Sequence, residues 1–345
     1  MSSLPYLTIV GKVAKVGCCI TILTNSLVTY VTIFQIKKIA VEYKVLIVIS
    51  TIFGALFSIL EVIVRPFMHS FNGSYIYFST TSFSNLPLSI KFCMLSLYSL
   101  AYMVIVFLLA IQFIYRYCVL LDNHYLEWFK SWKTLVWPLF GLFSSTIWTL
   151  SLWQCAPDFI SIDYLRREMK GNYGLRVEEL AGFHVLAYNP DGKLRQQTTL
   201  GILGCISILF ILYSIIFYSG IRIHYGIKSL VSLISARNHR LHKQLFRTLV
   251  LQITIPTFVH SFPVFIVFHL PFLNLKLSFP TGIIVCFFNI YPALDSMVLM
   301  VMVAEYRVVL KKMLWRIVPC SCLANRIEPT ASDEDDGGST VERTN

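Results

Sequence analysis

Charge is what this sequence has least of, because only 14% of its 345 residues are Asp, Glu, Lys or Arg. Soluble proteins carry about 25% charged residues. Hydrophobic residues make up 56% of the chain, and its mean hydropathy is +0.67. An apolar surface this large needs lipid to cover it. The composition therefore excludes a soluble globular protein and predicts one that crosses a membrane several times.

Motifs of enzymes and metal sites are missing as well. The sequence has no G-x-S-x-G, H-E-x-x-H, phosphate-binding loop or dinucleotide fingerprint, and its nine cysteines show no C-x-x-C or Cys/His spacing. We therefore expect no enzymatic activity, no bound metal and no cofactor. The net charge of +11 comes from basic residues scattered between apolar runs, which argues against a nucleic-acid partner. No internal repeat is visible, which counts weakly against transporters built from inverted repeats.

Long apolar runs dominate what is present. Seven uncharged or nearly uncharged runs of 20 residues or more can each cross a bilayer as a helix. They cover Val16–Ile36, Val45–Val64, Phe92–Tyr115, Thr134–Trp153, Thr198–Ile221, Thr248–Leu273 and Leu277–Ala304. The sequence therefore predicts an all-α membrane protein, a seven-transmembrane helix bundle over residues 16–304. Prolines at 256, 263, 271 and 280 predict kinks and a tight turn around the short break between the last two runs.

The basic residues favour one orientation of this bundle. With the N-terminus outside, the cytoplasmic segments hold 18 Lys and Arg residues and the outside segments hold 11. The cytoplasmic segments are 37–44, 116–133, 222–247 and 305–345. The positive-inside rule therefore predicts an extracellular N-terminus over residues 1–15 and a cytoplasmic C-terminus in a multi-pass protein. The sequon Asn72-Gly73-Ser74 lies outside in this topology, so we expect Asn72 to be glycosylated.

The segments between and after the spans also carry predictions. In the outer loop 154–197, Asp163–Met169 can form two helical turns that end at Gly171 or Gly174. A disulfide between Cys93 and Cys155 would fasten this loop over the bundle. Residues 305–320 predict a basic amphipathic helix on the inner lipid leaflet, and residues 321–345 a disordered tail. Cys320 and Cys322 follow this helix and are candidates for palmitoylation, which would add a lipid anchor. The first run lacks a small-residue cleavage site, so no cleavable signal peptide is expected.

Two formal charges lie inside the spans, Glu61 and Asp295. We expect Glu61 to pair with Arg65 one helical turn later, and Asp295 to join a polar cluster with Asn25 near Pro292. A small apolar or weakly polar ligand would suit a pocket with aromatic walls in the outer half of the bundle. The candidate ligand-binding residues there are Tyr98, Tyr102, His260, Phe262 and Asn289.

The third run ends in Gln112-Phe113-Ile114-Tyr115-Arg116-Tyr117, where an arginine between two tyrosines marks a membrane edge. This stretch resembles the usual His-Phe-Ile-Tyr-Arg-Tyr of one family, the nematode seven-transmembrane chemoreceptors of serpentine receptor class r (the Str group). The stretches Glu42–Leu46, Val64–Ser70, Tyr164-Leu165 with Tyr173–Leu175, and Tyr291–Asp295 with Glu305–Arg307 resemble its other motifs. The resemblance covers residues 10 to 316. Gln112 and Glu305 depart from the usual pattern, which leaves the subgroup open.

The resemblance implies a G-protein-coupled receptor for odorant-type chemicals in the ciliary membrane of sensory neurons. A small organic ligand and a heterotrimeric G protein would be its partners, with lipids around it and a receptor dimer as a further possibility. Arg116 and Tyr117, together with Arg237 and Arg240 of the basic inner loop, would meet the G protein. Tyr291, Pro292 and Asp295 would form the structural switch. A seven-span ligand-gated channel or small-solute transporter is the alternative.

Overall fold

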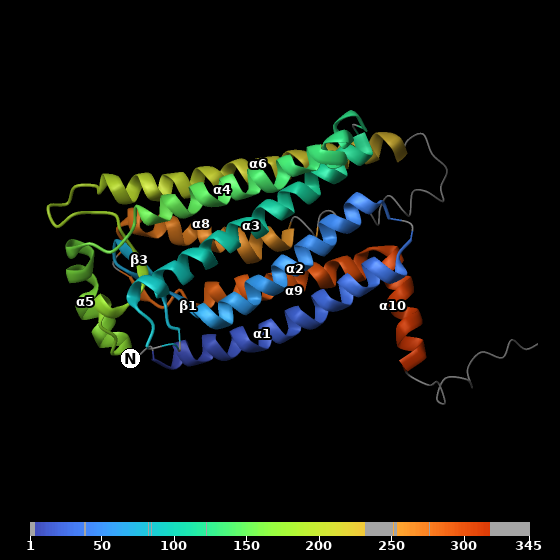
Figure 1. Cartoon of the computed structure of the whole chain (residues 1–345). Coiled ribbons are helices and arrows are strands. Elements are labelled where there is room, and N and C mark those ends of the chain that lie inside the picture. Colours follow the sequence, from blue (N-terminus) through green and yellow to red (C-terminus); the bar gives the residue numbers. More distant parts are fainter. Residues whose placement is uncertain are drawn as a thin grey trace, which may run out of the picture.

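The computed structural model describes residues 4–37, 39–81, 83, 85–121, 123–231, 251, 254–275 and 277–317. Long helices lie side by side and form one elongated bundle (Figure 1). Within the described residues, seven helices are long and apolar enough to cross a membrane. They cover Pro5–Gln35, Val41–Val64, Leu88–Leu121, Ser131–Trp153, Gln196–Gly226, Thr254–Leu273 and Ile284–Met302. The prediction of a seven-span helical bundle is thereby confirmed.

The helices have the following bounds. The first four spans contain α1 (Leu4–Tyr30) with a π-helical end (Val31–Gln35), α2 (Val41–Val64), α3 (Leu88–Leu121) and α4 (Val136–Trp153). Two 3₁₀ segments, Asn123–Phe129 and Ser131–Leu135, precede α4. The later helices are α5 (Phe159–Tyr173) in the outer loop, α6 (Gln196–Val231), α8 (Phe262–His269), α9 (Ile283–Met302) and α10 (Ala304–Ile317).

Two predicted boundaries were wrong. Helix α1 begins at Leu4, so residues 4–15 continue the first span and do not form a separate terminal segment. The side chains of Lys12 and Lys15 interrupt the apolar run in sequence but are exposed, so they do not interrupt the helix. The seventh helix begins at Ile283 and not at Leu277, because residues 278–279 are extended.

Span six is interrupted where the sequence places its prolines. Pro256 precedes a π-helical turn, Thr257–Ser261, and Pro263 lies in the first turn of α8. A 3₁₀ turn, Leu270–Leu273, and Asn274 in the left-handed region at φ 48° then end the span, as the predicted tight turn requires. A π-helical turn widens the helix and leaves its hydrogen-bond ladder irregular. Proline lies inside α9 as well, at Pro292.

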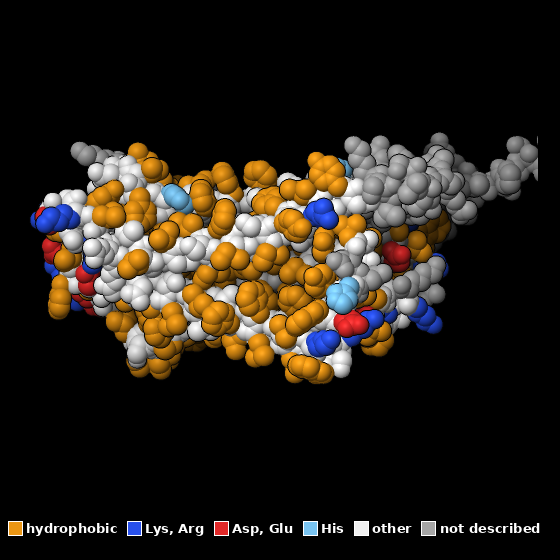
Figure 2. All heavy atoms as spheres, turned by 90° about the horizontal axis from the view of Figure 1, so that it is seen from above, with side chains coloured by type: hydrophobic (Ala, Val, Ile, Leu, Met, Phe, Trp, Pro, Cys, Tyr) orange, Lys and Arg blue, Asp and Glu red, His pale blue; other side chains and the backbone are white. Residues whose placement is uncertain are grey.

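The bundle has two different ends (Figure 1). We call the end that carries α5 and the β-strands the lid end, and the end that carries Arg116 and α10 the arginine end. In Figure 2 the Lys, Arg, Asp and Glu side chains gather toward the two ends, and hydrophobic side chains cover the flank between them. Large apolar side chains such as Leu23, Leu139 and Phe210 are exposed. This distribution fits a flank immersed in lipid.

The lid end contains a four-stranded antiparallel sheet that the all-α prediction missed. The strands are β1 (Pro66–Phe71), β2 (Ser74–Ser79), β3 (Gly182–Leu186) and β4 (Ser278–Phe279), in the order β3-β2-β1-β4. They come from the three connections at this end of the bundle. The sheet therefore ties these connections together over the mouth of the bundle.

The two faces of the sheet have different partners, because side chains along a strand alternate between faces. Tyr75 and Tyr77 of β2 pack with the buried residues of the spans. Ile76 and Phe78, their neighbours in sequence, pack with Leu165 and other buried residues of α5. Every residue of β2 is buried, which explains why the strand lacks the polar face of a half-exposed sheet.

Helix α5 confirms the predicted helical turns of the outer loop and is longer than expected. Asp158 caps its first turn, accepting a hydrogen bond from the Ser161 backbone N–H at 3.0 Å. Gly174 ends it in the left-handed conformation at φ 68°, as one of the two predicted glycines should.

The predicted disulfide does not fasten this lid. Cys93 and Cys155 are both free thiols in the structure, the first exposed and the second buried. The Cys155 thiol faces α6, with its Sγ 4.0 Å from the carbonyl oxygen of Thr198. Backbone pairing holds the loop instead, since β3 pairs with β2 and the His184 N–H donates to the Cys155 carbonyl at 2.7 Å.

Two buried histidines hold α5 on the sheet. His69 of β1 lies between the Tyr173 hydroxyl at 2.9 Å and the Glu168 carboxylate at 3.0 Å, both from α5. His184 of β3 lies 3.2 Å from the Ser161 hydroxyl, also from α5. Burial lowers the pKa of His69, although Glu168 opposes the shift, and burial lowers the pKa of His184 to about 4.

Acid should therefore loosen the lid. The pKa of His184 is about 4 in the folded lid and about 6.5 in an unfolded chain, so protonation favours the unfolded lid. Neutral His184 therefore contributes about 3 kcal/mol to the stability of the folded lid. This contribution is complete above pH 6.5 and is lost as the pH falls toward 4. Hydrogen exchange of the α5 amides, corrected for intrinsic rates, should be faster at pH 5 than at pH 7.5.

The variant His184→Gln should reduce the pH dependence of α5 exchange. The dependence that remains should come from His69, whose pKa burial also lowers. His124→Gln, which changes an exposed histidine at the arginine end, should leave it unchanged. Equal protection of α5 at both pH values in the unaltered protein would contradict the prediction.

Candidate functional site

A cavity lies directly under the sheet, between the lid and the spans. Its lining combines sheet residues with residues of four membrane helices. They are Met68, Tyr75, Tyr77, Tyr98, Ser99, Tyr102, Trp148, Leu152, Phe183, Val264, Phe268 and Phe288. We call this space the lid cavity. In the described structure it encloses about 30 Å³, room for about one or two water molecules.

Aromatic rings build most of the lining and pack on one another. Tyr102 stacks on Trp148 with ring centroids 5.7 Å apart, and Trp148 lies 5.7 Å from Phe268. Phe268 also stacks beneath Tyr75 of the sheet at 6.1 Å. The Trp148 indole N–H donates to the Ser99 hydroxyl at 2.9 Å, which satisfies a polar group within an apolar wall. The site is therefore a nearly dry aromatic chamber that the sheet covers.

The predicted ligand-binding residues divide between this chamber and other places. Tyr98 and Tyr102 line it, as expected from their shared face of α3. Phe262 does not, because its side chain is half exposed on the flank. Asn289 is fully buried, and its amide donates to the Ala14 carbonyl at 3.1 Å, on the side of α1. The side chain of His260 lies outside the described residues.

Sequence reasoning missed the roof of the chamber and its far wall. Tyr75 and Tyr77 belong to a hairpin whose Asn72-Gly73 turn, followed by an aromatic-rich run, was a usable signal. Trp148, Phe268 and Phe288 come from apolar runs with aromatics on several faces, so periodicity alone could not select them.

Glu61 does not form the expected pair with Arg65. Helix α2 ends at Val64, and the Arg65 backbone N–H still donates to the Glu61 carbonyl at 2.8 Å, one helical turn back. Arg65 itself adopts the left-handed conformation at φ 48°, so its side chain leaves the helical register that the expected pair requires. The Glu61 carboxyl accepts a hydrogen bond from the Tyr98 hydroxyl at 3.1 Å. Glu61 is 1% exposed. It is therefore a buried group in the last turn of α2, bonded to a tyrosine that lines the lid cavity.

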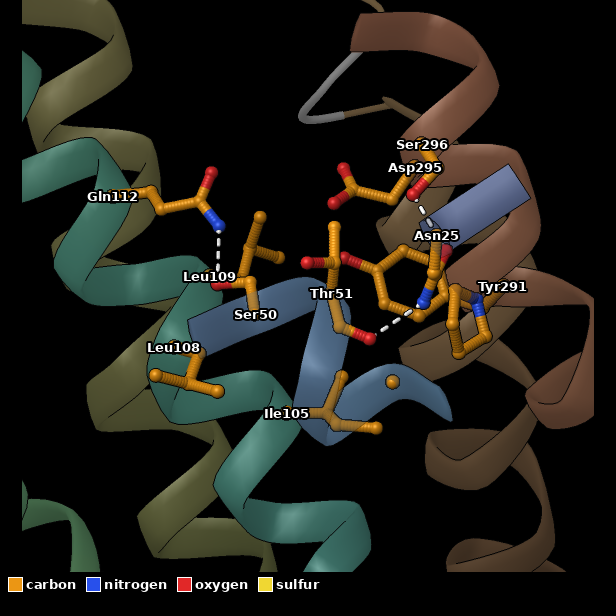
Figure 3. Close-up of a pocket in the computed structure, with 12 residues that line it drawn as sticks. Asn25, Ser50, Thr51, Ile105, Leu108, Leu109, Gln112, Tyr291, Asp295 and Ser296 are labelled. Carbon is orange, nitrogen blue, oxygen red and sulfur yellow. Dashed lines mark hydrogen bonds between the residues drawn. The ribbon is translucent and has the colours of Figure 1, made fainter. Parts of the chain in front are cut away.

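A second, polar cavity lies between α1, α2, α3 and α9, nearer the arginine end (Figure 3). It also encloses about 30 Å³. Its polar lining comprises Asn25, Ser50, Thr51, Gln112, Tyr291, Asp295 and Ser296. In Figure 3 the side chains of Gln112 and Asp295 extend from α3 and α9 toward the same space.

Hydrogen bonds around the polar cavity join four helices. Asn25 of α1 donates to the Thr51 carbonyl at 2.8 Å and accepts from the Ser296 hydroxyl at 2.6 Å. Asn25 therefore bonds to Ser296 and not to the neighbouring Asp295, its expected partner. Gln112 donates to the Ser50 hydroxyl at 2.8 Å. Gly54 is needed here, because an added Cβ would lie 2.9 Å from atoms of both Asn25 and Pro292.

Arg116 lies one helical turn beyond Gln112 on α3. Its guanidinium donates to the Tyr43 hydroxyl of α2, with an Nε–oxygen distance of 3.0 Å, and its carbon lies 5.3 Å from the Tyr43 ring centroid. Tyr43 in turn stacks on Tyr115 at 5.4 Å. The Arg116 charge also acts electrostatically on Asp295. Tyr117 packs against Tyr218 of α6, with ring centroids 6.2 Å apart.

Asp295, one of the predicted switch residues of α9, thus interacts electrostatically with Arg116, the predicted coupling residue of α3. Arg237, Arg240, Cys320 and Cys322 lie outside the described residues. Within the described part of the chain, no group of three His, Cys, Asp or Glu side chains could hold a metal ion.

The chain is similar in sequence to known proteins over most of its length. Residues 11–311 match the family described as "Serpentine type 7TM GPCR chemoreceptor Str". The "G-protein coupled receptor str-33" of Caenorhabditis elegans is 36% identical over 308 residues, which cover 87% of this chain and 89% of the relative. The "Serpentine receptor class r-10" of the same nematode is 25% identical over 312 residues, covering 89% and 91% of the two chains.

Three observations point to the same family. They are the seven spans, the Tyr115-Arg116-Tyr117 stretch at the end of α3, and a sequence match that extends over most of both chains. The chain belongs to the Str family of serpentine seven-transmembrane chemoreceptors, a family of GPCR-type receptors and not of enzymes.

Proposed function

We propose that this receptor binds a small organic ligand of the odorant type in the lid cavity and signals to a heterotrimeric G protein at the arginine end. The observation that carries the proposal is a closed aromatic chamber at one end of α3 and a restrained arginine at the other. Tyr98 and Tyr102 line the chamber, and Arg116 donates to Tyr43. Helix α3 joins the two sites without a break.

The chamber of the described structure is too small for a ligand, and this supports a switching mechanism. An apolar cavity that binds benzene measures about 150 Å³, against about 30 Å³ here. A ligand must therefore displace parts of the lining and so favours a different packing of the helices. Binding energy that differs between two packings shifts their populations, which is how a receptor passes on a signal.

The proposed orientation places the lid end outside the cell and the arginine end in the cytoplasm. Helix α10 would then lie at the inner leaflet, where its basic residues, including Lys311 and Lys312, attract anionic lipids. The plasma membrane of sensory cilia is the proposed location. Receptor dimers and palmitoylation of Cys320 and Cys322 stay predictions.

The alternative hypothesis, a ligand-gated channel or small-solute transporter, is less well supported. It needs a continuous polar path across the bundle, whereas the lid cavity is apolar and the polar cavity is a separate small space. Aromatic residues, including Tyr102 and Phe288 in ring contact at 5.2 Å, build the lid-cavity side of the bundle.

Removal of the arginine should uncouple binding from signalling. Arg116→Ala should keep ligand affinity within about twofold, because Arg116 lies far from the chamber, and should reduce ligand-stimulated nucleotide exchange on the G protein at least tenfold. Lys133→Ala is the matched control, since Lys133 lies at the same end and, among the described residues, pairs with the exposed Glu127 at 3.4 Å. Full signalling by Arg116→Ala at normal surface expression would contradict the assignment.

Release of the arginine should have the opposite effect. Tyr43→Phe removes the hydroxyl that accepts from Arg116 but keeps the ring stacked on Tyr115. A hydrogen bond to a charged group contributes about 1.5–3 kcal/mol, so ligand-independent signalling should rise about tenfold. Basal signalling equal to that of the unaltered receptor would show that this contact does not restrain the inactive packing.

Glycosylation tests the orientation. If the lid end is outside, Asn72 in the β1–β2 turn should carry a glycan, and enzymatic deglycosylation should increase the electrophoretic mobility of the protein. Asn72→Gln should migrate like the deglycosylated protein and respond no further. An N-terminal epitope that antibodies reach only after permeabilisation would overturn the orientation, whatever the state of Asn72.

A further inference from the structure

Glu61 has unfilled hydrogen-bonding capacity beside the lid cavity. Its Oε2 accepts from the hydroxyl of Tyr98, which lines that cavity, and its Oε1 has no hydrogen-bond partner among the described residues. A carboxyl group inside hydrocarbon is costly, and such groups usually mark a binding site or a pathway. Tyr98 is thus in contact with both the carboxyl and the proposed ligand site.

No cation of the protein occupies this position in the described structure. The ion pairs between described residues all lie elsewhere, in the lid and the connecting segments. Arg65 borders the same small space of about 10 Å³ as Glu61, but makes no ion pair with it. The Asn289 amide faces the carboxyl from α9 but is neutral. The site therefore has a place for a positive charge from outside the chain.

The lid cavity itself suits a cation. Aromatic faces carry negative potential and attract ammonium groups within about 6 Å of the ring centre. Aromatic side chains enclose the chamber from the sheet, from α3, from α4 and from α8 and α9. Among them Tyr98 both faces the chamber and binds Glu61, with its ring stacked on Phe57 at 4.8 Å.

We propose that the receptor recognises an amine: a ligand with a positively charged nitrogen on a small apolar body. The aromatic chamber encloses the apolar body and the ammonium group, and Glu61 supplies the counter-charge through the position that the Tyr98 hydroxyl now holds. This inference rests on the proposed function of the lid cavity as the ligand site.

The wall that gives way to such a ligand is α8. It contributes Val264 and Phe268 to the chamber. The π-helical turn Thr257–Ser261 precedes it directly, and Pro263 lacks a backbone N–H, so the hydrogen-bond ladder of span six is weakest beside this wall. Displacement of α8 enlarges the chamber without breaking α3.

A matched pair of probes tests the charge requirement. The full-length receptor in lipid nanodiscs is titrated with benzylamine and with benzyl alcohol at pH 7, where only the amine is charged, and binding is measured by calorimetry without G protein. The unaltered receptor should bind the amine at least tenfold more tightly, a difference of about 1.4 kcal/mol. Glu61→Gln keeps an acceptor for Tyr98 but removes the charge, so the ratio should fall to about one with the alcohol affinity unchanged.

Two further variants make the result interpretable. Glu127→Gln neutralises an exposed carboxylate at the arginine end and should leave the ratio unchanged. If Glu61→Gln does not fold, Glu61→Asp keeps the charge on a shorter side chain and should lower the ratio while leaving it above one. Equal or tighter binding of the alcohol, no binding of the amine, or an unchanged ratio in Glu61→Gln would overturn the inference.

The outcome is separable from that of the proposed function. A receptor that binds the amine but never activates a G protein would support the amine site and count against the coupling. A receptor that signals to uncharged ligands and ignores benzylamine would support the proposed function and overturn the amine site alone.

Discussion

The structure depends on one constraint, which is that polar groups inside a hydrocarbon layer must find their partners within the protein. Helix α3 provides several of these partners. About 67% of its most apolar window is buried, against 33% for α4 and α6, so it is the central helix. Tyr98 binds Glu61, Gln112 binds Ser50 and Arg116 binds Tyr43, all on α2. The pairing of α3 with α2 thus fixes the interior of the bundle along its whole length.

The same constraint applies to backbone groups where the chain leaves the helices. At the lid end, three connections satisfy their N–H and C=O groups by pairing into the sheet, with Ser70 of β1 opposite Phe279 of β4 and Tyr77 of β2 opposite Phe183 of β3. Because α5 covers one face and the spans cover the other, the sheet is buried on both sides. The roof of the lid cavity is therefore part of the folded core, and a ligand that enters must rearrange core packing and not merely fill an open cleft.

The sequence could reveal features that depend on residues close together in the chain, and it could not reveal contacts between residues far apart. Apolar runs identified all seven spans, and Gly174 correctly ended the outer-loop helix, because both signals are local. Glu61 was assigned to Arg65 by the rule of one helical turn, which failed because Arg65 ends α2 in the left-handed conformation and the true partner, Tyr98, lies 37 positions away. Cys93 and Cys155 were paired because both lie near the lid end, but the chain alone does not tell which face of a helix a thiol occupies. The pairing of β3 with β2 joins segments more than a hundred residues apart, beyond any periodic pattern.

The proposed communication between the two ends would follow from the geometry of α3. Tyr98 and Arg116 are 18 positions apart, which at about 1.5 Å per residue places them roughly 27 Å apart on one unbroken helix. A rigid helix cannot compress, so a change at the chamber reaches Arg116 as a tilt, a rotation or a shift of α3 against its neighbours. The contacts that resist such a movement are the hydrogen bonds to α2 and the electrostatic attraction between Arg116 and Asp295. Since Asp295 follows Pro292 on α9, movement of α9 weakens the hold on α3 from the other side. The polar cavity between α3 and α9 is thus the place where polar side chains of the two helices could exchange hydrogen-bond partners during the proposed movement.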